Sequence, residues 1–248
     1  MSRFPASPAL LRALLCLGLT ALLAPLAQAA EDKLSGDAGL MLAPSQSIIR
    51  EGKNTLAVLP FVAGDYGRAF ARVDTFGVKT LKFGYGHLEL IGRYRADAYE
   101  VDGLTRRDAP VPLGVGSLQV TPIGAFELNV VRDFGDSAGA VGMARYIAKL
   151  ARGPVSVYPE VGGEYLNRRY ANYYYGTREA DASTVGRHYA TSNALNLFVG
   201  SLLRYDLTDK YALQAYWRYT RYDDTITDSP LVSRKGRHNG FVAVTRSF

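Results

Sequence analysis

Three side chains in the second half of the chain are of the types that form a hydrolase site. Ser183, His188 and Asp181 match a catalytic triad, in which histidine takes the serine proton and a carboxylate orients the histidine. Nothing in their spacing requires such a site, and His87 and His238 lie far away in the sequence. No His/Asp cluster has metal-ligand spacing, and no glycine-rich phosphate loop is present. The sequence therefore predicts no enzyme, no metal and no cofactor.

A larger set of charged side chains alternates with apolar residues. Around residue 90, for example, Leu88, Leu90 and Tyr94 oppose Glu89 and Arg93. Charges of both signs on a shielded face either pair with one another in a narrow interior or line a selective pore. The first interpretation is favoured, and the second remains the alternative. The predicted interior charges are Arg72, Asp74, Glu89, Arg93, Arg95, Glu127, Arg145, Glu160, Glu164 and Arg218.

This alternation has the period of a β-strand and recurs along most of the chain. Tight turns at Arg152-Gly153-Pro154 and at Leu207–Lys210 separate strands rich in Tyr, Val and Leu. Pro60 weakens the second strand locally. The predicted strands are 36–43, 55–66, 69–77, 88–95, 123–133, 139–150, 155–167, 193–206, 211–222 and 240–248.

The last stretch, Gly240 to Phe248, suggests what kind of β-protein this is, and the rest of the chain must decide. Val242 and Val244 alternate up to a terminal Phe248, which suits contact with lipid. The pattern resembles the C-terminal assembly signal of outer-membrane proteins, although Arg246 stands where an aromatic residue is usual. An edge strand of a soluble β-protein is the alternative. The even number of strands, about ten, favours an all-β transmembrane antiparallel barrel.

The start of the chain supports export. Residues 1–29 read as a cleaved signal peptide, with an apolar run and a small-residue cleavage site at Ala27-Gln28-Ala29. Cys16, the only cysteine, lies within it, so the mature barrel (residues 30–248) has no disulfides. Without Arg3 and Arg12 of the signal peptide, the mature chain has 27 basic and 23 acidic side chains, a balance of +4, which suits lipid and lipopolysaccharide of a Gram-negative outer membrane. No Lys/Arg block favours nucleic acid.

The topology follows from placing the C-terminus in the periplasm. The turns near Arg152 and Thr208 are then periplasmic, and loops 44–54, 78–85, 168–192 and 224–238 face outward. Asp97–Leu118 is the exception, because it is long and falls on the periplasmic side. We expect a periplasmic excursion there. The alternative is a hidden hairpin, which would give a barrel of twelve strands.

Several motifs resemble the MipA/OmpV family. Asn172-Tyr173-Tyr174-Tyr175-Gly176 followed by Tyr189, Leu207-Thr208-Asp209-Lys210, and Asp228-Ser229-Pro230-Leu231-Val232 match its elements, as do Leu59-Pro60 and Phe248. Ala43–Ser47 departs from the family, because the usual Tyr and Gly are missing there. The resemblance covers most of the mature chain and implies an outer-membrane barrel without catalytic residues.

The resemblance also implies partners. The name-giving member is described as an adaptor that joins the lytic transglycosylase MltA to a bifunctional penicillin-binding protein. A docking segment of this kind is expected in 97–118, where the candidate residues are Leu104, Arg106, Arg107, Asp108 and Val111. A plug or a simple link is the alternative for this segment.

Two other functions remain open. The barrel is either a narrow channel for small solutes, or an adhesin or small-molecule-binding protein that acts through its outer loops. For the second, Tyr173, Tyr174 and Tyr175 are candidates for outer-loop recognition, or else belong to the aromatic girdle at the membrane boundary. Phe248 is expected to act in assembly.

Overall fold

Strands make up most of the chain, as the alternation predicts. The computed structural model describes residues 33–248, so the predicted signal peptide, residues 1–29, lies outside the described residues. None of its helices is long and apolar enough to cross a membrane. The strands are β1 (Ser35–Ser45), β2 (Thr55–Tyr66), β3 (Ala69–Arg72), β4 (Thr75–Phe83), β5 (Gly86–Arg93), β6 (Leu113–Thr121), β7 (Gly124–Arg132), β8 (Ala140–Ile147), β9 (Leu150–Arg152), β10 (Val155–Leu166), β11 (Ala194–Asp206), β12 (Tyr211–Arg221) and β13 (Gly236–Ser247). The helices are α2 (Arg168–Tyr175), α3 (Glu179–Val185) and α4 (Asp224–Thr227).

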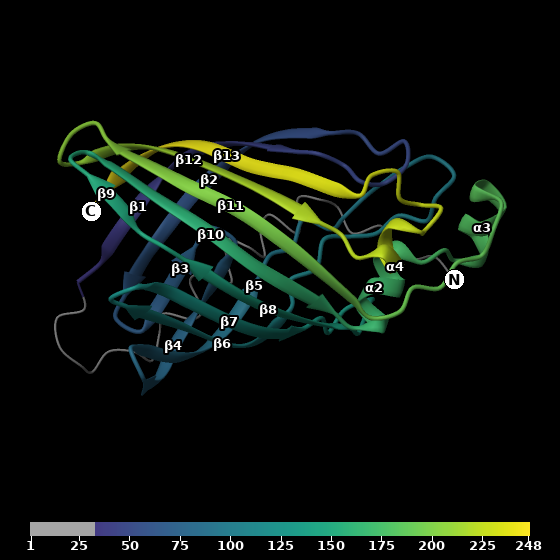
Figure 1. Ribbon diagram of the computed structural model, residues 1–248, viewed down its shortest axis with the longest axis horizontal. Coiled ribbons are helices and arrows are strands. Elements are labelled where there is room, and N and C mark those ends of the chain that lie inside the picture. Colours follow the sequence, from purple (N-terminus) through teal and green to yellow (C-terminus); the bar gives the residue numbers. More distant parts are fainter. Residues whose placement is uncertain (1–32) are drawn as a thin grey trace, which may run out of the picture. The chain divides into compact units, whose positions relative to one another are not determined.

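The sheet closes on itself between the last strand and the first (Figure 1). β13 pairs antiparallel with β1, with Leu40 opposite Val244, and the other strands pair with their neighbours in the chain. β8 and β9 pair one after the other with β10, so they form one strand of the wall. The wall therefore has twelve antiparallel strands, and closure pairs the two end strands that an open sheet would expose.

Two strands were missing from the predicted set of about ten. The predicted strand 69–77 is a hairpin, because the chain turns at Val73 and Asp74 between β3 and β4. β6 occupies the end of the segment that was expected to be an excursion, and it pairs with β5 and β7. The alternative of twelve strands is the correct one.

Because of the two extra strands, two segments lie at the opposite ends of the barrel from those predicted. The turn between β4 and β5 lies at the end of the barrel that carries the C-terminus, and not with the long loops. Residues 94–112 lie at the opposite end, beside the connections 46–54 and 167–193. The prediction that 97–118 shares the end of the C-terminus is therefore wrong. Figure 1 shows the helices at one end and the C-terminus at the other.

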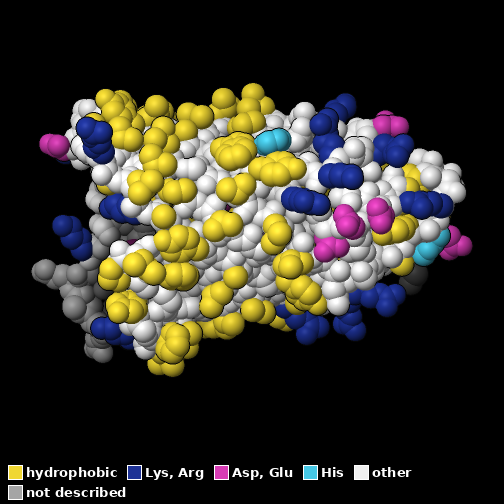
Figure 2. All heavy atoms as spheres, in the orientation of Figure 1, with side chains coloured by type: hydrophobic (Ala, Val, Ile, Leu, Met, Phe, Trp, Pro, Cys, Tyr) yellow, Lys and Arg dark blue, Asp and Glu magenta, His cyan; other side chains and the backbone are white. Residues whose placement is uncertain are grey.

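Apolar side chains cover the outside of the wall. Val242 and Val244 are about half exposed, whereas Ala243 and Thr245, which alternate with them, are buried, as the terminal alternation predicts. Leu40 on the adjacent β1 is 65% exposed. Figure 2 shows hydrophobic side chains spread along the wall, while charged side chains gather at the helical end. This distribution is that of a barrel embedded in lipid.

Candidate functional site

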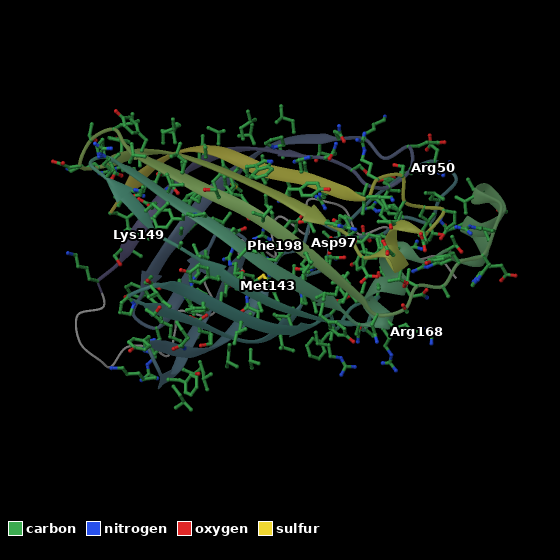
Figure 3. The ribbon with its side chains drawn as sticks, viewed as in Figure 1. Arg50, Asp97, Met143, Lys149, Arg168 and Phe198 are labelled. Atoms are coloured by element: carbon green, nitrogen blue, oxygen red, sulfur yellow. The ribbon has the colours of Figure 1, made fainter. Side chains whose placement is uncertain are left out.

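The interior holds a cavity of about 530 Å³ that reaches from the middle of the barrel toward the helical end. Its lining combines apolar groups such as Met41, Phe61 and Phe241 with paired charges. Ligand cavities of proteins commonly have volumes of about 300–1,000 Å³ and a mainly apolar lining with a few polar groups. In Figure 3, Met143 and Phe198 lie within the barrel, and Asp97 lies nearer the helices.

Glu160 on β10 is the centre of the largest charge cluster. One of its carboxylate oxygens accepts hydrogen bonds from Arg218 at 2.8 Å and from the Tyr216 hydroxyl at 2.7 Å. The other accepts from Arg145 at 2.9 Å, and Arg145 also donates to Glu127. The cluster runs along the neighbouring strands β7, β8, β10 and β12 on one side of the interior, with β11 between the last two. It pairs charges of both signs.

Further pairs hold the wall near β3, β4 and β5. Arg72 donates two hydrogen bonds to Glu89, at 2.7 and 2.8 Å, which is the bidentate geometry of a strong ion pair. Arg93 donates to Asp74 at 3.1 Å and also contacts the sulfur of Met143. These side chains therefore join β3 and the β3–β4 turn to β5 across β4.

Arg95 connects the barrel interior to Asp97 and to helix α2. Its guanidinium makes two hydrogen bonds with Glu164 on β10, and its Nε donates to Asp97 and to the Tyr170 hydroxyl at 2.8 Å each. Tyr170 in turn donates to Asp97 at 2.7 Å. Wall, loop and helix α2 thus share one network.

The helical end is closed by packed loops, which we call the cap: residues 46–54, 94–112, 133–139, 167–193 and 222–235. Helix α2 begins at Asn167, whose side-chain oxygen accepts from the Tyr170 and Ala140 amides and so joins the helix to β8. Tyr170 and Tyr174, one turn apart, are almost fully buried with Ile226. The cap therefore has a hydrophobic core of its own.

A buried ion pair fixes the cap loop 94–112 to helix α3. Arg107 and Asp181 are both about 1% exposed, and their guanidinium and carboxylate meet at 3.0 Å. Arg107 also donates to the backbone oxygens of Tyr173 and Thr105, and Asp181 accepts from the amides of Thr105 and Arg178. Burial alone would raise the pKa of Asp181, but these hydrogen bonds outweigh it and lower that pKa.

The ten predicted interior charges all lie in ion pairs inside the barrel. Five arginines meet five carboxylates there, so the set carries no net charge. Lys149, by contrast, is exposed near the end of the C-terminus (Figure 3). Arg50 and Arg168 mark the opposite end in the same view.

The predicted recognition tyrosines occupy a different environment. Tyr174 and Tyr175 are 1% and 4% exposed and pack in the cap, so both expectations for them, exposed loop and lipid boundary, are wrong. Only Tyr173 reaches the surface, where its hydroxyl donates to Asp136. The sequence motif was taken for a loop, but it is a helix that turns its tyrosines inward.

The predicted docking residues divide into two groups. Arg107 is the buried anchor described above, and Leu104 packs against the core of the cap. Arg106 and Asp108 form an exposed pair, and Val111 is 48% exposed. Phe248 lies at the seam, where its amide and oxygen bond with Gly36; its role in assembly stays a prediction.

The triad residue types do not meet. Ser183 donates to the backbone oxygen of Ala180, His188 is exposed, and both oxygens of Asp181 are already bonded. Within residues 33–248 no three His, Cys, Asp or Glu side chains are grouped so as to hold a metal.

Four residues of the site were absent from the sequence-based set: Asp97, Tyr170, Asp181 as an ion-pair partner, and Arg237. Asn167 three residues before Tyr170, with Tyr174 one turn later, is a helix-start signal that would have located α2. Asp97, Asp181 and Arg237 carry no local signal, because their partners are distant in sequence.

The fold and the site agree with comparisons to known proteins. The family model "MltA-interacting protein MipA" matches residues 38–248. The chain belongs to this family. It is 24% identical to the putative outer membrane protein YiaT of Escherichia coli over 84% of the chain and 88% of that protein. It is 25% identical to the outer membrane protein Omp26La of Vibrio anguillarum, covering 54% of the chain and 53% of the relative. It is 22% identical to the MltA-interacting protein of Escherichia coli, covering 55% and 56%.

The family assignment and the closed wall together define the protein's place in the cell. It is an outer-membrane β-barrel of a Gram-negative bacterium.

Proposed function

We propose that this protein is a non-enzymatic, non-conducting barrel that binds a small molecule in the cavity beneath its cap. The observation that carries the proposal is the cavity itself, about 530 Å³, which is lined by the charge cluster at Glu160, by apolar side chains and by residues of the cap. Charges that are paired with one another leave little net electric field to attract a permeating ion. The apolar side chains between them suit contact with a ligand.

The orientation of the barrel supports access from outside the cell. The connections at the end of the C-terminus are short turns, such as Tyr66–Ala69 and Leu207–Lys210, and the long connections are all in the cap. Barrels of this class have short periplasmic turns and longer extracellular loops. We therefore place the cap outside and the C-terminus in the periplasm.

Planar-bilayer recordings test the non-conducting part of the proposal. The reconstituted protein should give no stable ion-selective openings, because Arg145, Glu127, Glu160 and Arg218 pair with one another inside the barrel. Arg145→Ala should introduce openings or leakage if this paired cluster is the barrier, whereas Arg246→Ala, on the outer face, should not. Steady openings in the unaltered protein, with a selectivity that Glu160→Ala changes, would establish the channel instead.

The second candidate is the adaptor role. It is favoured by one observation, the name "MltA-interacting protein" carried by the family and by one relative. In that role the protein would bring a lytic transglycosylase and a penicillin-binding protein to the membrane. With the cap outside, the parts of residues 33–248 that are available for docking in the periplasm are the short turns and the adjoining barrel rim.

A further inference from the structure

The wall of the barrel is incomplete beside its shortest strand. β3 has four residues, and on the β2 side it pairs with Ala63–Tyr66 alone, at one end of β2. From Thr55 to Phe61, β2 pairs with β1 on one side and with no strand of residues 33–248 on the other. We call this interval the side opening. Residues 94–97 lie across it, since the Tyr94 amide donates to Asp74 at the β3–β4 turn.

The unpaired edge of β2 is adapted to this position. The Val62 oxygen accepts from the Val73 amide, so Val62 directs its backbone groups toward β3. Residues two apart in a strand point the same way, and therefore Pro60 also faces the side opening. Proline has no N–H to leave unpaired, which is why it is confined to strand edges.

The depth of the side opening places it in the apolar band. Val62 pairs with Ala38, close to the start of β1 at Ser35, so the opening begins near the periplasmic end and extends toward the cap. Leu56 and Val58 on its outer rim are 67% and 69% exposed. An open sheet edge at membrane depth occurs only where it lines a water-filled cavity or is covered by protein. The edge of β2 is therefore covered by residues 94–97 or reached by water from the cavity, because lipid cannot satisfy its backbone groups.

The cavity reaches the side opening. Phe61 on β2, Val73 and Asp74 at the turn, and Tyr94 and Ala96 across the gap all line it. Leu59 points inward by its alternation with Phe61, yet it is 41% exposed, compared with 2% for Phe61. The inward face of β2 therefore becomes accessible where its neighbouring strand is missing.

Arg237 on β13 is the one cavity arginine that has no carboxylate within ion-pair distance among the described residues. It donates to the Ala96 oxygen at 3.2 Å and to the Ser45 hydroxyl, so it lies at the cap end of the side opening. Its Nε is buried and bonds to no atom of residues 33–248. A buried guanidinium N–H without a partner is costly, and an anionic group is the partner that suits it best.

We infer that the side opening admits an amphipathic anion from the outer membrane into the cavity. The ligand has an apolar body, which lies against Phe61, Met41 and Phe241, and a carboxylate or phosphate head, which binds Arg237. This inference rests on the proposed binding function and adds the route of entry and the chemical class of the ligand.

The test uses the full barrel reconstituted in phosphatidylcholine vesicles. The probes are a fluorescent long-chain fatty acid and the fluorescent alcohol of the same chain, each supplied in the membrane. The unaltered protein should bind the acid at least about tenfold more tightly than the alcohol, because only the acid pairs with Arg237. Arg237→Gln should remove that preference, and Arg246→Gln on the same strand should leave it unchanged.

Two further variants test the route. Leu59→Trp should narrow the side opening and lower the rate of binding of the membrane-supplied acid about tenfold or more. Val199→Trp, on the exposed face of β11 away from the side opening, should not. Heat-modifiable migration on detergent gels checks that each variant is folded. An unchanged rate in folded Leu59→Trp overturns the lateral route while the binding function stands. An acid preference that survives Arg237→Gln overturns the head-group assignment.

Binding by the unaltered protein distinguishes failure of the proposed function from failure of the inference about the route of entry and the head group. If neither probe binds, from the membrane or from water, the proposed function itself fails along with the inference. If the acid binds equally fast when supplied from water and Leu59→Trp has no effect, the ligand enters through the cap. Tighter binding of a phospholipid than of the free acid would identify the head group as a lipid phosphate.

Discussion

At the residue scale, neighbouring positions of one sequence motif differ completely in environment. Arg106 is exposed and pairs with Asp108, whereas Arg107 is buried with Asp181 and two backbone oxygens. The sequence shows two adjacent arginines and cannot distinguish them, because the partner of Arg107 lies on α3, far along the chain. The sequence predicted which charged side chains lie inside the barrel, because the alternation along a strand sets their direction. It did not predict which charged side chains are buried within the cap.

This difference predicts unequal costs for the two arginines. Arg107→Ala leaves the Asp181 carboxylate buried without its main charge partner, which costs about 3–5 kcal/mol in a fully desolvated pair. Arg106→Ala removes a solvent-exposed pair worth about 0–1 kcal/mol. Hydrogen exchange of residues 97–112 in the folded barrel measures the local opening. Equal exchange in the two variants would show that the pair does not hold the loop.

At the element scale, the strands that follow strict alternation were predicted, and those interrupted by an unusual turn were not. The β3–β4 turn contains no Gly, Pro or Asn, and Val73 adopts a positive φ of 57°. A β-branched residue rarely takes this conformation, so the sequence 69–77 reads as one strand. In β6, Leu113 and Val115 have one parity, and Leu118 and Val120 have the other, so no single alternation indicates the strand.

The conformation of Val73 predicts an unusual substitution effect. Val73→Gly removes the cost of a left-handed residue, about 1–2 kcal/mol, against a glycine entropy of about 0.5–1 kcal/mol, and should stabilise the barrel slightly. Val78→Gly removes the same side chain from β4, where φ is not positive, and should destabilise it. Unfolding in denaturant with lipid vesicles compares them. Val73→Gly as harmful as Val78→Gly would argue against strain at the turn.

At the scale of the whole molecule, one missed turn reversed the placement of a whole segment. The unpredicted strand β4 reverses the direction in which the following chain crosses the barrel, and the unpredicted β6 reverses it again. Every strand after β6 therefore has the predicted direction, and the stretch between β4 and β6 lies at the opposite ends from those predicted. The closed wall, the apolar exterior and the paired interior were predictable because each follows from period two. The cap was not, because its core is assembled from connections distant in sequence.

The distribution of long and short connections yields the last prediction, which concerns a periplasmic partner. If the protein is an adaptor, a photo-cross-linking residue at Thr208, in the turn beside the C-terminus, should capture a lytic transglycosylase or penicillin-binding protein in cells. The same residue at Val111, in the cap, should capture neither, because it lies on the other side of the membrane. A stable interface buries about 1,200–2,000 Å² in total, so the neighbouring turns must contribute too. Capture from Val111 alone would reverse the orientation, and capture from neither position would leave ligand binding as the function to pursue.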